Sequence, residues 1–295
     1  MTFVCSRRPD LRRILIATDF SARADRAIRR AALLARQFDA SLVVTHVVDD
    51  DRAESLVSAE QRESETLLDK LARGLRESDG LKCESRLALG EPFEQVPAVA
   101  RAVEADLIVV GPYRRDRLKN IFIGATAERI IRSSPLPVLM ANGLPAAAYE
   151  RILLATDFSE NASRAIATAK ALRLLDAAQV SAAHAYQASA DSLMARTAAN
   201  ADHRKDYLLA EAAAALAQLD ALSQTAGLNL VDQITERIEL SAAETIRDIA
   251  RRVRAEMVVV GAQGRSAMSQ AWLGSVSQDL LRFADIDVLV VPTPR

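Results

Sequence analysis

The sequence has little cysteine and no excess of basic charge. Its two cysteines, Cys5 and Cys83, are far apart and form no CxxC pair, so we expect neither a disulfide framework nor a cysteine-based metal site. Lys and Arg total 38 against 39 Asp and Glu, which gives a net charge of −1, whereas a duplex-binding surface carries a basic excess. We expect free thiols, no metal held by protein side chains and no nucleic-acid partner.

Long apolar runs are also missing. Nowhere do about 18 apolar residues follow one another, and the opening segment 1–10 has no apolar core of signal-peptide length. We therefore expect a cytoplasmic protein with no membrane partner. Half of the residues are apolar and 26% are charged, which is the composition of a folded protein. The length of 295 residues is sufficient for two ordinary domains.

What the sequence does contain is an internal repeat. The segment RILIATDFS at 13–21 returns at 151–159 as RILLATDFS, with an offset of 138 residues. Between Gly111 and Gly261 the offset has grown to 150 residues. The chain therefore contains two copies of one domain, and the second copy is 12 residues longer.

The extra residues of the second copy fall between His184 and Glu244. The alanine-rich stretch 191–225 lies in this interval and predicts a helix longer than its counterpart at 52–78. A longer helix would elaborate the surface without adding a new domain.

Within each copy, apolar runs alternate with segments of helical periodicity. Runs at 13–17 and 41–48 predict strands, and the apolar spacing over 27–38 predicts a helix between them. The wholly apolar stretches 107–110 and 257–260 indicate strands buried on both faces, as in a parallel sheet covered by helices. With right-handed crossovers, each copy becomes a doubly wound α/β domain.

The two copies are predicted to be separate domains, residues 1–144 and 145–295. The connector 142–148 contains Gly143 and Pro145, which are the breakers that a domain boundary needs.

Two loops of each copy carry candidate ligand residues, because ligands of open parallel sheets bind beyond the carboxyl ends of the strands. After its fourth strand the second copy has Gly261, Gly264 and, after nine further residues, Gly274 and Ser275 before a helical pattern. Glycine permits φ above zero and close backbone approach, and helix-start N–H groups and the Ser275 hydroxyl can donate to phosphate oxygens. The pattern predicts a phosphate-binding loop, and a tight turn with Ser275 as an N-cap is the structural alternative.

An acidic residue ends the first strand of each copy. Asp157 and Asp19 stand in Thr-Asp-Phe-Ser segments, at the sheet edge where the glycine loops are expected. Each carboxylate can accept from an adenine amino group or a ribose hydroxyl. Each can instead accept from backbone N–H groups at the next helix start, with Ser159 or Ser21 as the N-cap. Both roles stay open at this point.

One histidine lies inside the second strand of each copy. His46 and His184 stand alone there and, with His203, form no cluster with the cysteines. A lone strand histidine is usually a hydrogen-bonded core group, so we assign these residues no chemistry.

The first copy departs from the glycine pattern. Arg114 replaces the second glycine after Gly111, and Ala125, which follows Gly124, lacks a hydroxyl. This loop is therefore predicted to be impaired in phosphate binding. Its basic run over 114–119 can attract a different anion, although such runs are usually solvated surface.

These features resemble the universal stress protein family in its tandem form, with two such domains in one chain. The likeness covers nearly the whole sequence. It rests on the strand-one motif that ends in Asp, on the histidine of the second strand, and on the G-2x-G-9x-G-S loop of the family's ATP-binding branch. It implies two tandem Rossmann-like domains of the adenine nucleotide alpha hydrolase type, each a five-stranded parallel sheet sandwiched by helices.

The resemblance also implies where a nucleotide lies in the second copy. Asp157 and the backbone around Ala185 would hold the adenine end, the glycine loop would hold the phosphates, and Mg²⁺ would accompany ATP. Since the first copy's loop is impaired, one nucleotide per chain is expected. The predicted nucleotide-binding residues are Ala155, Asp157, Ala185, Gly261, Gly264, Arg265, Gly274, Ser275 and Val276, and the first-copy candidates are Asp19, Val47, Gly111 and Gly124.

The expected function is a stress-response regulator that binds ATP, or another adenine nucleotide, mainly in its C-terminal domain. Family members pair domains through their final strands, so the apolar strands predicted at 136–141 and 286–291 are expected to pair within the chain or in a homodimer. Other surfaces would remain for an unidentified regulatory protein.

Two alternatives stay open, namely a stress scaffold that binds no nucleotide and a slow ATP-hydrolysing enzyme of the same fold. The enzyme is disfavoured because the GxxxxGK[ST], Ser-Gly-Gly-x-Asp-Ser and G-x-G-x-x-G loops are missing. In addition, no Lys lies between Gly261 and Ser275 to act on a transferred phosphate.

Overall fold

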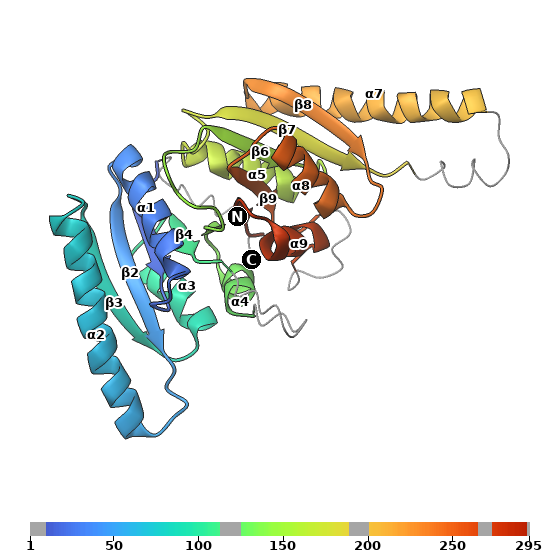
Figure 1. Ribbon diagram of the computed structural model, residues 1–295. Coiled ribbons are helices and arrows are strands. Elements are labelled where there is room, and N and C mark those ends of the chain that lie inside the picture. Colours follow the sequence, from blue (N-terminus) through green and yellow to red (C-terminus); the bar gives the residue numbers. More distant parts are fainter. Residues whose placement is uncertain (1–9, 113–124, 189–200, 265–272, 294–295) are drawn as a thin grey trace, which may run out of the picture. The chain divides into compact units, whose positions relative to one another are not determined.

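The structure of the protein is a computed structural model that describes residues 10–112, 125–188, 201–264 and 273–293. The chain divides into two compact units. One ends at Ala148 and includes Thr168–Asp176, and the other comprises Tyr149–Ala167 and the chain from Ala177 onward. Each unit has a sheet flanked by helices (Figure 1).

The two copies contain the same alternation of strands and helices. The first copy has β1 (Arg13–Ala17), α1 (Ala24–Phe38), β2 (Ser41–Val48), α2 (Glu54–Glu77), β3 (Cys83–Leu89), α3 (Pro92–Ala102), β4 (Leu107–Val110), α4 (Ala125–Ser133) and β5 (Val138–Met140). The second copy has β6 (Arg151–Ala155), α5 (Glu160–Ala171), β7 (Gln179–Tyr186), α7 (Ala201–Ala226), β8 (Leu230–Arg237), α8 (Ala242–Arg252), β9 (Met257–Gly261), α9 (Ser275–Phe283) and β10 (Asp287–Val291).

Each sheet has five parallel strands in the same spatial order. In the first unit the order is β3-β2-β1-β4-β5, and in the second it is β8-β7-β6-β9-β10. The pairs within each unit are parallel. The predicted fold class is therefore confirmed. The strand order reverses beside β1 and β6, which is where such sheets bind ligands beyond the carboxyl ends of their strands.

The inner strands form because their residues are largely apolar and are buried on both faces, whereas β3 and β8 carry charged side chains. Ile14, Leu15 and Ile16 of β1 are wholly buried, and every residue of β4 is buried. The helix α1 turns its alanines and Leu34 to the sheet. It ends where Asp39 takes a left-handed conformation with φ of 50°, so the chain turns back into β2.

The described part of the long helix of the second copy is two residues longer than its counterpart in the first copy. The helix α7 has 26 residues against 24 in α2, and in the sequence residues 187–200 separate α7 from β7, against residues 49–53 between β2 and α2. Residues 189–200, where the longer helix was predicted to begin, lie outside the described residues. No helix among the described residues is long and apolar enough to span a membrane.

The thiol of Cys83 is free and buried on β3. Burial raises the pKa of this thiol to about 11, although the nearby Arg76 guanidinium lowers it in part. Cys5 lies outside the described residues.

Candidate functional site

A cavity of about 820 Å³ opens at the carboxyl ends of the strands in the second unit, and we call it the second cavity. Its walls come from the ends of β6, β7 and β9 and from the starts of α5 and α9. The predicted Arg265 lies outside the described residues. The other eight predicted residues, Ala155, Asp157, Ala185, Gly261, Gly264, Gly274, Ser275 and Val276, all line this cavity.

The turn after β6 is held by its own side chains. The Thr156 hydroxyl oxygen accepts from the Phe158 N–H at 2.9 Å, and Asp157 Oδ1 accepts from the Ser159 N–H at 3.0 Å. Phe158 takes a left-handed conformation with φ of 60°. The Ser159 hydroxyl oxygen accepts from the Ala162 N–H at 3.2 Å in the first turn of α5. Asp157 thus has the backbone-binding role, and Ser159 caps the helix.

The histidine of the second strand locks the same turn. His184 Nδ1 donates to the Thr156 carbonyl oxygen at 2.7 Å, and its ring lies against that of Phe158 with centroids 4.4 Å apart. The side chain is therefore hydrogen-bonded, as expected from the sequence. It is half-buried and lines the cavity, so it shapes the site without an assigned chemical step.

Gly261 is required for close packing of the end of β9 against the start of α5. A Cβ on Gly261 would stand 2.9 Å from the carbonyl carbon and oxygen of Asn161 and 3.1 Å from the Ala162 nitrogen. Backbone atoms cannot move aside as a flexible side chain can. None of Gly261, Gly264 and Gly274 has a positive φ, so the expectation that these glycines supply left-handed backbone was wrong. Their role is close approach.

The second and third glycines pack the loop onto itself and onto the strand-one acid. A Cβ on Gly264 would stand 2.7 Å from Asp157 Oδ2. A Cβ on Gly274 would stand 3.3 Å from the Gly264 nitrogen, and the Gly274 N–H donates to the Ala262 carbonyl oxygen at 2.8 Å. The two ends of the loop are therefore in contact although residues 265–272 separate them in the sequence.

The helix α9 begins at this contact. Its N-cap is Gly274 and Ser275 is its first residue, so the alternative in which Ser275 is the N-cap was wrong. The first intrahelical bond runs from the Gln278 N–H to the Gly274 carbonyl oxygen. No side chain of the described residues caps the helix. The N–H groups of Ser275, Val276 and Ser277 at this positive helix end are therefore placed to bind an anion.

The sequence did not predict the residues that hold the start of α9 and the glycine loop in place. The buried Ser277 hydroxyl donates to the Gly261 carbonyl oxygen at 2.6 Å and ties α9 to the end of β9. The Thr293 hydroxyl lies 3.3 Å from the side-chain oxygens of both Asn161 and Gln263, and can donate to one of them at a time. These are long-range contacts, and no local sequence signal marks them.

A wall of the second cavity from α7 was also missed. Glu211 and Gln218 of α7 line the cavity with two alanines between them, and Ile238, Ala242 and Ile246 add an apolar surface near α8. Because α7 carries alanine on every face, its sequence gave little indication of which side faces the site.

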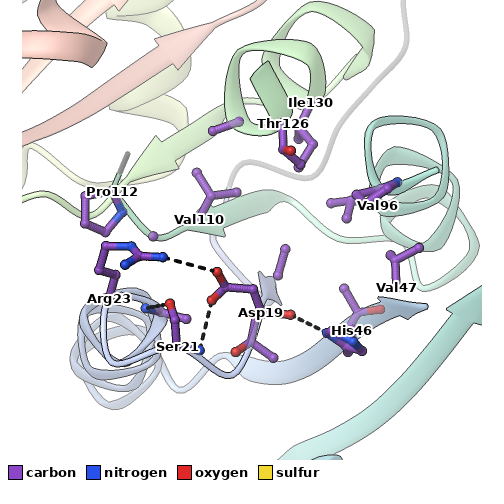
Figure 2. A pocket seen from close by; sticks show the side chains of 17 residues that line it. Asp19, Ser21, Arg23, His46, Val47, Val96, Val110, Pro112, Thr126 and Ile130 are labelled. Carbon is purple, nitrogen blue, oxygen red and sulfur yellow. Dashed lines mark hydrogen bonds and ion pairs between the residues drawn. The ribbon is translucent and has the colours of Figure 1, made fainter. Parts of the chain in front are cut away.

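The first unit has a smaller cavity, of about 310 Å³, at the equivalent place, and we call it the first cavity. The predicted Asp19, Val47 and Gly111 line it. Gly124 and the arginine-rich stretch from Arg114 lie outside the described residues. The same turn is present, since Asp19 Oδ1 accepts from the Ser21 N–H and His46 Nδ1 donates to the Thr18 carbonyl oxygen (Figure 2).

The first cavity differs in what its acid contacts. Arg23 Nη2 lies 3.7 Å from Asp19 Oδ2, and Figure 2 shows the guanidinium turned toward this carboxylate inside the cavity. The repeat aligns Arg23 with Asn161 in the second copy, where the side chain instead accepts from Arg164 at 3.1 Å. In the described part of the second cavity no Lys or Arg side chain lines the wall.

Comparisons with known proteins identify one family in both halves. The model of the universal stress protein family matches residues 10–142 and again residues 148–292. A universal stress protein of Methanocaldococcus jannaschii is 29% identical over 137 residues, which is 44% of this chain and 81% of that protein.

Solved structures show the same fold over nearly the whole chain. A universal stress protein from Archaeoglobus fulgidus has a TM-score of 0.69 at 19% identity, with 95% of this chain and 98% of that one covered. A protein of unknown function from Pseudomonas aeruginosa has a TM-score of 0.62 at 18% identity, with 97% and 94% covered.

Proposed function

Because this chain belongs to the universal stress protein family, with one family match in each half, we propose that it is a stress-response regulator that binds ATP or another adenine nucleotide. The binding site is the second cavity. The first copy, with its altered glycine loop, acts as a structural or regulatory partner. In this proposal one nucleotide binds per chain.

One observation carries the proposal. The eight described residues that were predicted from the strand-one motif, the second strand and the glycine loop line a single cavity, and an uncapped helix N-terminus faces it. A volume of about 820 Å³ is within the range of small-molecule and cofactor sites. The N–H groups at the start of α9 suit phosphate oxygens, and Ala185, Ala242 and Ile246 offer an apolar surface for a base.

The contact between Asp157 and Gly264 refines the proposed binding mode. The carboxylate lies against the loop that would hold phosphates, so it is near the sugar and phosphates as well as the proposed adenine end. A carboxylate beside a polyphosphate is repelled unless a cation lies between them. Mg²⁺ usually binds to substrate phosphates and one or two carboxylates, and Asp157 is the residue that would hold it here.

Mass spectrometry of the released ligand tests the proposal. Purified protein is denatured, the supernatant is analysed for nucleotides, and the stripped protein is titrated with ATP and Mg²⁺. Gly264→Arg copies the residue of the first copy at this position and places a long side chain against Asp157. Gln224→Arg on the exposed end of α7 adds the same charge outside the cavity and serves as the matched control.

We expect wild type and Gln224→Arg to bind ATP and Gly264→Arg to lose most of this binding. The single tryptophan, Trp272, lies between Gly264 and Gly274 in the sequence, so its fluorescence provides a second readout close to the loop. Equal nucleotide content and equal affinity in Gly264→Arg and wild type would contradict the site. No binding by wild type would favour the scaffold alternative.

Two further parts of the proposal concern organisation. The domain division at residues 144 and 145 stays a prediction, as does pairing through the strands predicted at 136–141 and 286–291. An ATP turnover assay with Mg²⁺ separates a binding protein from a slow hydrolase. We propose no turnover above that of buffer, because no Lys or Arg of the described residues lines the second cavity to act on a transferred phosphate.

A further inference from the structure

The α7 wall of the second cavity has no counterpart in the first. Helix α7, which lies along β8 (Figure 1), contributes Glu211, Ala214, Ala215 and Gln218 to the second cavity. Among the described residues, none from α2 lines the first cavity. The second cavity is also the larger one, at about 820 Å³ against about 310 Å³. The second copy therefore has a part of its site that the repeat itself does not explain.

Glu211 is the charged residue of this wall. Its side chain is half-buried and lines the cavity. Within the described chain it has neither a hydrogen bond nor an ion pair, and its neighbours on the wall are alanines. A partly desolvated carboxylate without donors is unfavourable unless a ligand or water donates to it. Glu211 is thus an acceptor turned toward the space where a ligand would bind.

The charge of Glu211 decides which part of a nucleotide can lie beside it. A phosphate is disfavoured beside Glu211 because two anions repel, and the phosphates have the N-terminus of α9 and the cation proposed beside Asp157 instead. A ribose presents two adjacent hydroxyl donors, which match the two oxygens of one carboxylate. Acidic side chains accept from ribose hydroxyls in other α/β nucleotide-binding folds.

We propose that Glu211 accepts hydrogen bonds from the ribose hydroxyls of the bound nucleotide and makes the second cavity selective for ribonucleotides over dideoxynucleotides. This inference rests on the proposed function, since it requires an adenine nucleotide in the second cavity. It adds a residue that determines specificity. This residue comes from α7, which lies outside both the glycine loop and the strand-one motif.

The test compares ATP with 2′,3′-dideoxyATP on the full chain. Wild type, Glu211→Ala and Glu211→Gln are titrated with each nucleotide in the presence of Mg²⁺, by calorimetry and by Trp272 fluorescence. Alanine is a strong helix former and the neighbours of Glu211 are alanines, so folding of Glu211→Ala is not at risk. Asp220→Asn removes a charge from the same helix at an exposed position outside the cavity, and it controls for the overall charge.

We expect wild type and Asp220→Asn to bind ATP about tenfold more tightly than dideoxyATP. In Glu211→Ala the ATP affinity should fall to that of dideoxyATP, while the dideoxyATP affinity does not fall. Equal loss for both nucleotides would show that Glu211 contacts the base or acts only through its charge, and would overturn the inference. Unchanged discrimination would overturn it as well, with the proposed function intact, whereas absence of ATP binding by wild type would overturn both.

Discussion

The Asp157 carboxylate lies against Gly264, with its Oδ2 atom 2.7 Å from the position of a Cβ on residue 264. Its other oxygen, Oδ1, accepts from the Ser159 N–H at 3.0 Å. The acid after the first strand and the second glycine of the loop after the fourth strand therefore form one contact. A side chain at residue 264 must turn Asp157 away from its place, with consequences for both ends of a bound ligand.

Coupling between these two residues is the first prediction. Gly264→Ala should weaken ATP binding because the new methyl group displaces the carboxylate. In an Asp157→Ala background the same substitution should cost much less, with a coupling energy of about 1 kcal/mol between the two changes. Titration of the four proteins with ATP measures this energy. Strictly additive losses would show that residue 264 acts without Asp157.

The second prediction concerns Gly261, whose neighbours are backbone atoms. Gly261→Ala should destabilise the second copy by about 1–3 kcal/mol, because the helix start at Asn161 must shift. Urea unfolding followed by Trp272 fluorescence measures the change. Gly74→Ala is the opposite control, since nothing lies within 4 Å of a Cβ there and alanine is favoured inside a helix by about 0.5–1 kcal/mol.

Unfolding of the Gly74→Ala control is followed by circular dichroism, because Gly74 lies in α2 of the first copy. An unfolding midpoint of Gly261→Ala equal to that of wild type would mean that the strand end and the helix start are not in close contact in solution.

A third prediction tests the bond that holds α9. Ser277 is 4% exposed and donates to the Gly261 carbonyl oxygen at 2.6 Å. Ser277→Ala leaves this carbonyl without the donor, so we expect a loss of about 1–2 kcal/mol in the free energy of unfolding. The neighbouring Ser275 is exposed, and Ser275→Ala should change stability by less than about 0.5 kcal/mol. Similar effects of the two changes in urea unfolding would argue against the bond.

The fourth prediction concerns the thiol of Cys83. With its pKa raised to about 11 by burial, roughly one thiol in a thousand is ionised at pH 8. A Cys5→Ser variant isolates Cys83, and its reaction with a disulfide reagent should be slow in the native protein and fast in urea. Because the thiolate is the reactive form, the native rate should rise from pH 8 to pH 10. A native rate as fast as that in urea would refute the burial.

The architecture could be predicted because the inner strands are largely apolar and because the two copies share one pattern of strands and helices, whereas β3 and β8 contain charged residues. Strands predicted at 13–17 and 41–48 are β1 and β2 with the same bounds. The long helix predicted over 191–225 is α7 from Ala201 to Ala226, and its predicted start at residue 191 stays a prediction because residues 189–200 lie outside the described residues.

Most candidate residues around the second cavity could be predicted because two short motifs lie at the ends of adjacent strands, and Ala185 was predicted from the family resemblance of the second strand. The physical roles of these residues could not be predicted from the sequence to the same extent. A sequence does not distinguish a glycine that needs positive φ from one such as Gly261 that lies against another backbone. Glu211 and Thr293 were missed because they reach the site through tertiary packing, far along the chain from either motif.

The close packing of Gly261 against Asn161 distinguishes the first glycine of the motif, which serves packing, from the later positions, which face the ligand site. Gly111, its counterpart, also faces backbone atoms, with Arg23 and Ala24 at 3.2 Å from a Cβ position, although the first copy has lost the second glycine. The first glycine thus serves close backbone packing in either copy, whether or not a ligand binds. A copy of this domain can therefore lose or exchange its ligand through changes at positions such as 114 and 125 while its architecture stays intact. Only the later positions of the motif carry information about what is bound.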